Sequence, residues 1–479
     1  MTQYDNFIGG EWVAGAKYAP NVNPSNTDDI IGDYAVADRK QALDAIAAAK
    51  AAAPIWGSSG IQARFDALDF IATELLARKA EIGELLAREE GKTLAEGIGE
   101  VARAGQIFKF FAGETLRLTG DILPSTRPGL SVEVTREPVG VIGMITPWNF
   151  PIAIPAWKIA PALAHGNTVV FKPAGLVPGS AWALAEIISR AGLPAGTFNL
   201  VNGSGREVGE TIVTSDDVRA ISFTGSVPTG SDIRNRAVAR GAKVQMEMGG
   251  KNPIVVLDDA DLDIAVDCAL NGAFFSTGQR CTASSRIIVT EGIHDAFVEA
   301  LANATQALVV GDARDGATQI GPVVDAGQLE SNLKYVEQAV VEGGTLVCGG
   351  NRLADKPEGY FMAPALITDT TPEMTINREE VFGPVASVVK VKDYKEALKV
   401  ANDCQFGLSS GICTGSLEYA TDFKRKSEAG MVMVNLPTAG VDYHVPFGGT
   451  KGSSYGSREQ GSYAKEFYTT VKTAYTRSA

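Results

Sequence analysis

A cysteine at position 281 has surroundings that suggest chemistry. It lies in FFSTGQRCTASS (274–285), beside Arg280, among small and polar residues. Cysteines kept for packing more usually have bulky apolar neighbours, although a buried structural thiol stays open as an alternative. A nearby arginine or exposed backbone N–H groups favour the thiolate, which is the nucleophilic form. The stretch therefore indicates an exposed thiol on a turn, where proteins often present catalytic groups.

Two other polar side chains could assist such a nucleophile. Glu247 stands between two methionines in QMEMGGKNP (245–253). Apolar surroundings raise the pKa of an acid, so that it can act as a base near neutral pH. Asn149 is flanked by prolines in PWNFP (147–151), and a rigidly held amide is a good donor to an oxyanion. A surface glutamate on an edge strand and a turn asparagine are the simpler alternatives.

Two further segments are compatible with nucleotide binding. FTGSVPTG (223–230) links a strand to a helix, and its glycines would let a phosphate approach the helix N-terminus. Its spacing is G-x4-G rather than the G-x-G-x-x-G of the dinucleotide fingerprint, so alone it is weak evidence. Lys172 ends the buried run VFKP, where it could contact a ribose or a phosphate or could simply be solvated.

Alternating helices and strands must position these residues. Segments 38–56, 61–90 and 94–113 have helical periodicity, and Gly91 ends the second of them. From residue 139 onward, short apolar runs such as VGVIGMITP and TVVFKP alternate with helical segments, a pattern typical of buried parallel strands. The second half of the chain repeats this pattern. We therefore expect two α/β domains, the first with a doubly wound sheet.

Composition excludes several classes of partner. The net charge of −13 argues against binding to nucleic acid or to an anionic membrane. The five cysteines have no CxxC pair and the three histidines are far apart, so we expect neither a disulfide framework nor a metal site. Segment 138–157 is uncharged but contains four prolines, which argues against a membrane span. The N-terminus has no export-signal pattern, and we expect a cytoplasmic protein.

Together the motifs resemble the aldehyde dehydrogenase superfamily over essentially the whole chain. The glutamate and cysteine motifs follow in the order and approximate separation of that family. The sequences of these motifs are most similar to those of bacterial 2-oxoglutarate semialdehyde (2,5-dioxopentanoate) and succinate semialdehyde dehydrogenases. The motifs that carry the resemblance are FIGGEWV, PWNFP, FKPA, FTGS, MEMGGKNP, GQRCTA, EEVFGP (379–384) and PFGGTKGSSYGSREQG (446–461).

The resemblance implies an NAD(P)-dependent oxidation of an aldehyde to the acid, without phosphate or CoA as acceptor. Cys281 would attack the aldehyde carbon, and the Asn149 side chain with the Cys281 backbone N–H would hold the oxyanion. Hydride would leave to the nicotinamide, and Glu247 would activate the water that hydrolyses the thioester. A catalytically silent binding or structural protein on the same fold and a CoA-acylating enzyme are the alternatives.

The resemblance also implies contacts with NADP, NAD or both. Lys172 and Glu380 would bind riboses, and Ser226 would meet the pyrophosphate. Many NAD-specific members have a glutamate three residues after the lysine, where this chain has Gly175. Without that carboxylate a 2′-phosphate is neither repelled nor crowded, so we expect NADP to be accepted. The rest of the cofactor site would be lined by Ile145, Trp148, Gly205, Phe223, Gly225, Met248 and Phe382.

The expected substrate is a small aldehyde that carries a carboxylate, such as 2-oxoglutarate semialdehyde. Succinate semialdehyde and aromatic or sugar-derived aldehydes are alternatives. Arg280 is the candidate cation, although it could equally be a structural arginine. Some oxoglutarate-semialdehyde members carry an arginine eight residues after the oxyanion asparagine, where this chain has Trp157. Candidate walls and tunnel-mouth residues, for some of which core packing is an equal alternative, are Phe150, Trp157, Phe275 and His444.

The family fold implies three parts. A Rossmann-like dinucleotide-binding domain would comprise 1–116 and 139–250, and an α/β catalytic domain would comprise 251–450. A small β oligomerisation arm would comprise 117–138 and 451–479, whose alternating segments would add strands to a neighbour's sheet. Because free edges of this kind promote aggregation, we expect a homodimer or a homotetramer.

Overall fold

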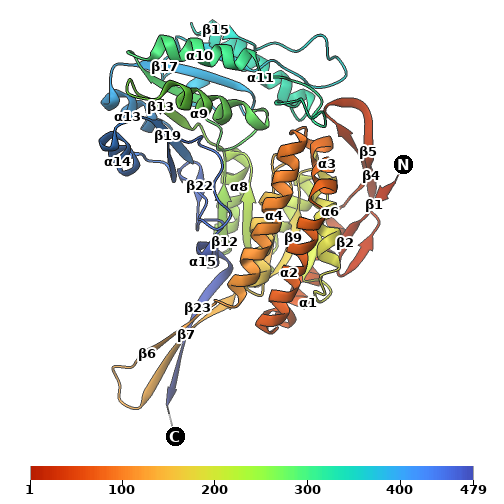
Figure 1. Ribbon diagram of the computed structural model, residues 1–479. Helices are drawn as coiled ribbons and strands as arrows, with labels where there is room; N and C mark the ends of the chain where they lie inside the picture. Colours follow the sequence, from red (N-terminus) through yellow and green to blue (C-terminus); the bar gives the residue numbers. More distant parts are fainter. Residues whose placement is uncertain (1, 478–479) are drawn as a thin grey trace.

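The computed structural model describes residues 2–477, which form two α/β bodies with a β ribbon extending from them (Figure 1). An eight-stranded sheet lies in the first body, in the order β22-β12-β11-β8-β9-β10-β2-β3. Strands β8 to β12 are mutually parallel, and β22 and β2 pair antiparallel at its two sides. The strands are β2 (Asn6–Ile8), β3 (Glu11–Val13), β8 (Val141–Ile145), β9 (Thr168–Lys172), β10 (Phe198–Leu200), β11 (Val218–Thr224), β12 (Lys243–Glu247) and β22 (Ser454–Tyr455).

Alternate residues of these strands bury against helices on opposite faces. Ile142 and Met144 of β8 pack with α2, α4, α5 and α6, whereas Val141 packs with α1, α7 and α8. This alternation is the period of two that a strand imposes on its side chains. The helices are α1 (Arg39–Gly57), α2 (Ile61–Ala77), α3 (Lys79–Glu90), α4 (Leu94–Thr115), α5 (Ala153–Ala164), α6 (Pro178–Ser189), α7 (Glu210–Thr214) and α8 (Val227–Ala239), with a π-helical turn η1 (Gly205–Gly209).

Helix boundaries follow local chemistry. Helix α3 ends at Gly91, whose φ of +94° is accessible to glycine at little cost. Helix α4 begins at a capping box, in which the side chains of Thr93 and Glu96 each accept from the other's backbone N–H. The long helical stretch expected over 61–90 is divided at Arg78 into α2 and α3.

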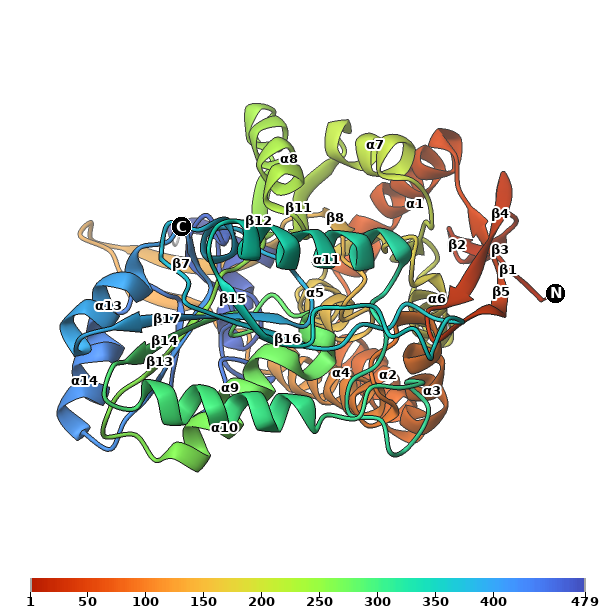
Figure 2. The same ribbon diagram turned by 90° about the horizontal axis from the view of Figure 1, so that it is seen from above.

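The second body contains a seven-stranded sheet in the order β15-β16-β17-β14-β13-β19-β20, parallel except for β15. Figure 2 shows α9 and α10 on one side of this sheet and α11 on the other. Its elements are β13 (Pro253–Val256), α9 (Leu262–Phe274), the 3-10 turn η2 (Phe275–Gly278), β14 (Arg286–Thr290), α10 (His294–Gln306), α11 (Ala326–Val341), β15 (Thr345–Cys348), β16 (Ala365–Thr368), α12 (Thr375–Arg378), β17 (Val385–Val391), α13 (Tyr394–Asn402), β19 (Ser409–Cys413), α14 (Leu417–Lys426) and β20 (Met431–Val434).

The projecting ribbon is a three-stranded sheet in the order β23-β7-β6 (Figure 1). It exposes apolar side chains, including Ile122, which is 82% exposed, and Val471, which is 61% exposed. The C-terminal segment expected in this arm is divided, because β22 pairs with β12 whereas β23 pairs with β7. The remaining elements are β1 (Gln3–Tyr4), β4 (Lys17–Asn23), β5 (Asn26–Val36), β6 (Asp121–Pro124), β7 (Leu130–Pro138), β18 (Phe406–Gly407), β21 (Thr450–Lys451), η3 (Ser462–Ala464), α15 (Lys465–Tyr468) and β23 (Thr469–Arg477).

The doubly wound sheet changes direction beside β8, which pairs with β9 on one side and β11 on the other. Ligands of open α/β sheets bind at such a switch point, outside the carboxyl ends of the strands. Among residues 2–477, no helix combines the length and the apolar composition needed to cross a bilayer.

Candidate active site

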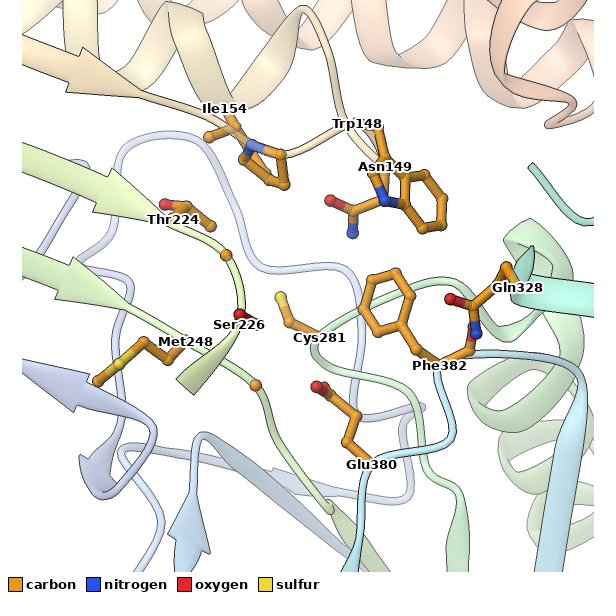
Figure 3. Close-up of a pocket in the computed structure, with 13 residues that line it drawn as sticks. Trp148, Asn149, Ile154, Thr224, Ser226, Met248, Cys281, Gln328, Glu380 and Phe382 are labelled. Atoms are coloured by element: carbon orange, nitrogen blue, oxygen red, sulfur yellow. The ribbon is translucent and has the colours of Figure 1, made fainter. Parts of the chain in front are cut away.

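A cavity of about 240 Å³ lies at the switch point, beyond the ends of β8 and β11. Figure 3 shows the side chains of Asn149, Cys281 and Glu380 turned into it from three different segments. The sequence motifs around Cys281 and Asn149 are therefore brought together. The residues that line the cavity are Pro147, Trp148, Asn149, Ile154, Thr224, Gly225, Ser226, Met248, Gly249, Cys281, Gln328, Glu380 and Phe382.

A sharply bent turn carries Cys281. Helix α9 ends at Phe274, and beyond Phe275 the residues Ser276, Thr277 and Gly278 all have positive φ (51°, 56° and 64°). The left-handed region is costly for the two non-glycine residues, so surrounding contacts must hold them there. Glu96 supplies such contacts, because its Oε1 accepts from the Ser276 backbone N–H at 2.8 Å and from its hydroxyl at 2.9 Å.

The thiol of Cys281 is protonated at neutral pH. Burial raises its pKa to about 12, and the charges of Glu380 and Glu247 add to the effect. Its backbone carbonyl accepts from the Asn252 amide at 2.7 Å, which fixes the residue after the turn. Attack by this sulfur therefore requires a base that removes the thiol proton.

The Asn149 amide is anchored on both sides. Its Nδ2 donates to the Gln279 carbonyl at 2.9 Å, two residues before the nucleophile. The backbone carbonyl of Asn149 accepts from Lys92 Nζ at 2.6 Å, and Lys92 is paired with Glu100 at 2.6 Å. The second Nδ2 hydrogen is left for another acceptor, as an oxyanion donor requires.

Sequence reasoning missed the contribution of Lys92 and Glu100. Glu100 Oε1 accepts from the backbone N–H groups of Ile152 and Ala153, at the start of α5. The buried pair thus holds both ends of the segment that carries Asn149. The sequence REEGKTLAEGIGE shows that Lys92 and Glu100 could form an ion pair. The backbone groups that they bond lie some fifty residues further along the chain, so the sequence of this helix does not predict those contacts.

Glu247 lies at the end of β12 and is buried, but it does not line the cavity. Its Oε2 accepts from the Ser454 hydroxyl at 2.5 Å. Burial and the charge of Glu459 raise the pKa of Glu247 well above the usual range, and the Ser454 hydrogen bond and the charge of Lys158 oppose this. Its carboxyl therefore has the raised pKa that we expected for an acid between two methionines. It is turned towards Ser454 of β22.

Six of the expected cofactor residues line the cavity. Glu380 Oε1 accepts from the Gly250 backbone N–H at 2.8 Å, and burial raises its pKa to about 7. The rings of Trp148 and Phe382 meet edge to face at 5.3 Å, with Phe382 in the left-handed region at φ 58°. Thr224 and Gln328, which sequence reasoning missed, also line the cavity. The six are Trp148, Gly225, Ser226, Met248, Glu380 and Phe382.

The other five expected cofactor residues lie outside this cavity, beside the same strands. Lys172 ends β9, and burial lowers its pKa to about 8. A Cβ added at Gly209 would lie 3.7 Å from the Lys172 Cδ, so this lysine packs against the turn that begins at Gly205. Gly175 is exposed, and a Cβ there would meet nothing within 4 Å. The remaining two are Ile145 and Phe223, which belong to β8 and β11.

These features fit a dinucleotide. The glycine-containing turn after β11 leads directly into α8, whose first N–H groups could meet a phosphate. The carboxyl of Glu380 and the buried amine of Lys172 are available to bond the ribose hydroxyl groups of a dinucleotide. No cluster of potential metal ligands occurs among residues 2–477.

A second cavity, of about 300 Å³, lies on the other side of Cys281 and shares Ile154 with the first. Of the expected substrate residues, it contains Phe150, Trp157 and Arg280. Phe275 instead packs against the core of the second body, and His444 is exposed outside the lining. The lining consists of Glu96, Gly99, Glu100, Arg103, Phe150, Ala153, Ile154, Trp157, Ser276, Arg280, Cys281, Thr282, Ala439, Gly440, Val441 and Phe447.

Comparisons with known proteins agree with this geometry. A model of the aldehyde dehydrogenase family matches residues 12–474. The chain is 44% identical to alpha-ketoglutaric semialdehyde dehydrogenase of Bacillus subtilis (strain 168), over 99% of this chain and 98% of that protein. It is 43% identical to alpha-ketoglutarate semialdehyde dehydrogenase of Haloferax volcanii, over 98% of both chains.

A solved structure is similar over nearly the whole chain. Betaine aldehyde dehydrogenase of Staphylococcus aureus, in complex with NAD+, superimposes with a TM-score of 0.96 at 34% identity. The match covers 99% of this chain and 95% of that one. These similarities confirm the expected fold class and the resemblance carried by the motifs.

Proposed function

The chain belongs to the aldehyde dehydrogenase family and is an NAD(P)-dependent aldehyde dehydrogenase, and from this premise we propose that its substrate is 2-oxoglutarate semialdehyde. Full-length similarity to two enzymes named for this aldehyde carries the substrate proposal. The cavity on the second side of Cys281 supports it, because two arginines lie among its walls, which also contain two glutamates and several apolar side chains.

In the proposed reaction the Cys281 sulfur adds to the aldehyde carbon. Glu247 takes the thiol proton, which requires its carboxyl to turn from Ser454 towards the sulfur. The Asn149 amide and the Cys281 backbone N–H hold the resulting oxyanion, and donors of this kind contribute about 3 kcal/mol each. Bound NAD(P) supplies the hydride acceptor, and Trp148 and Glu380 would help to hold it.

The second half of the reaction is hydrolysis of the thioester on Cys281. Glu247 first releases the thiol proton to solvent. A water molecule then adds to the thioester carbon, and Glu247 accepts a proton from that water. The carbon–sulfur bond breaks, the carboxylic acid leaves, and the sulfur is regenerated. Burial and the charge of Glu459 raise the pKa of Glu247, which makes it a stronger base than an exposed carboxylate.

Three finer features belong to the same proposal. The open space at Gly175 leaves room for a 2′-phosphate, so NADP is accepted alongside NAD. The exposed apolar side chains of the arm support assembly into a homodimer or a dimer of dimers. We place the enzyme in the cytoplasm, where both dinucleotides are available.

An aldehyde panel assayed with NAD and NADP in parallel tests the proposal. We expect kcat/KM for 2-oxoglutarate semialdehyde to exceed that for hexanal at least tenfold, and NADP to support turnover within a hundredfold of NAD. Product analysis should find the free acid with and without CoA. Equal turnover of hexanal would contradict the substrate assignment, and an acyl-CoA product would contradict hydrolysis.

A further inference from the structure

The cavity on the substrate side of Cys281 contains four charged side chains, and three of them form two or more hydrogen bonds with the protein. They are Glu96, Glu100, Arg103 and Arg280. The bonding of each decides whether it is free to meet a ligand, because a buried charge without a partner is costly.

Both acids are engaged. Glu96 accepts from the backbone and the hydroxyl of Ser276 with one oxygen, and from the backbone and the hydroxyl of Thr93 with the other. Glu100 accepts from Lys92 at 2.6 Å and from two backbone N–H groups at the start of α5. Neither carboxylate is therefore available to neutralise an arginine in the cavity.

Arg280 is anchored to the backbone beside the nucleophile, although its Nε is buried without an acceptor. Its Nη2 donates to the backbone carbonyls of Asn271 and Gly272, in the last turn of α9. Cations are stabilised at this end of a helix by the helix dipole and by the unpaired carbonyls. Arg280 thus supports the turn that carries Cys281.

Arg103 is different. Its one hydrogen bond within residues 2–477 runs from Nη2 to the Gln460 side chain at 3.2 Å, and its Nε is buried without an acceptor. Burial lowers the pKa of Arg103, and Glu100 and Asp442 oppose this by their charges but form no ion pair with it. The guanidinium is therefore a buried cation with unused donors.

The surroundings of Arg103 orient it. Its guanidinium carbon lies 5.9 Å from the centre of the Trp157 ring, which in turn stacks on Phe447 at 5.4 Å. A guanidinium held over an aromatic face keeps its edge free for planar, two-point bonding to a carboxylate. The cation that sequence reasoning sought at Arg280 or at position 157 is supplied from α4, above the Trp157 ring.

We propose that Arg103 binds the carboxylate of the semialdehyde and so directs its aldehyde end to Cys281. This inference rests on the proposed function and names the residue that selects the substrate. The carboxylate accepts hydrogen bonds from the N–H groups of Arg103 that have no other acceptor. The indole of Trp157 packs against the carbon chain.

The variant Arg103→Met tests this, because methionine keeps an unbranched apolar stem and removes the charge. We expect kcat/KM for 2-oxoglutarate semialdehyde to fall about 100-fold, mainly through KM, whereas kcat/KM for hexanal changes far less. Arg103→Lys should recover part of the loss, since a lysine keeps the charge but not the two-point geometry. Glutarate, a non-reactive dicarboxylate, should bind the wild-type protein in calorimetry and bind Arg103→Met at least tenfold more weakly.

Arg280→Met is the matched control, because this arginine lines the same cavity but bonds only to backbone. It should lower activity with both aldehydes by a similar factor. The inference is overturned if Arg103→Met keeps the preference for the semialdehyde, or loses both activities equally. A wild-type enzyme without any preference for the semialdehyde would instead refute the proposed function itself.

Discussion

Replacing Ser454 with alanine should move the pH dependence of turnover in a direction that the structure specifies. The Ser454 hydroxyl donates to Glu247 Oε2 at 2.5 Å, and this bond stabilises the carboxylate form alone. It therefore holds the pKa of Glu247 below the value that burial and Glu459 would otherwise give. Without it the pKa rises further, and a larger fraction of Glu247 is protonated at any given pH.

The size of the effect follows from the bond that is lost. A hydrogen bond to a charged acceptor contributes about 1.5–3 kcal/mol, and one pKa unit corresponds to about 1.4 kcal/mol. Since water would partly replace the hydroxyl, we expect the acid limb of kcat to move up by about one pH unit. Below that limb kcat should fall about tenfold, and at high pH it should approach the wild-type value.

The assay is the pH profile of kcat, combined with the pre-steady-state burst of reduced cofactor. Because Glu247 is the base both for the thiol proton and for the hydrolytic water, a larger protonated fraction predicts a slower burst and a slower steady state at low pH. Ser454→Thr is the control, since a threonine hydroxyl can still donate to Glu247 and accept from the Gly449 N–H. An acid limb that stays in place in a folded Ser454→Ala enzyme would refute this account of Glu247.

Three further outcomes are expected. Asn149→Ala should lower kcat/KM about 10²–10³-fold while the dissociation constant of NAD is retained; a loss below tenfold would rule out its role as oxyanion donor. Gly175→Glu should lower kcat/KM for NADP at least tenfold and leave that for NAD little changed, because the new side chain enters open space. Equal losses with both cofactors would contradict the placement of the 2′-phosphate. Joint substitution of the exposed arm residues Ile122 and Val471 by glutamate should give monomers in light scattering, and an unchanged mass would exclude this sheet as the interface.

The sequence predicts the strands that are buried on both faces of the sheet. VGVIGMITP and TVVFKP are apolar without interruption, and they form β8 and β9 at the centre of the sheet. Strands of two residues, such as β21 and β22, carry no periodicity and could not be predicted. Their positions depend on the sheet edge they meet, and β22 is what brings Ser454 to Glu247.

The sequence predicts a site residue where the local motif alone determines the backbone conformation. The turn at Cys281 and the prolines around Asn149 are local, so the sequence indicates both residues. The direction of the Glu247 carboxyl is set by Ser454, more than 200 positions away. The bonding of Arg280 and of Arg103 likewise depends on the folded structure, which decides how many hydrogen-bond donors each arginine has left for a ligand.

One helix connects the separate parts of the catalytic apparatus. Just before and within its first turns, α4 and its cap contribute Lys92, which holds Asn149, and Glu96, which holds the turn before Cys281. Glu100 and Arg103 lie on the same side of that helix, since residues three and four apart share a face. The nucleophile comes from the second body and the oxyanion donor from the first, so neither sheet alone can fix the distance between them. A rigid helix that bonds to both can, and the next position on the same face of that helix, Arg103, lines the same cavity as Cys281.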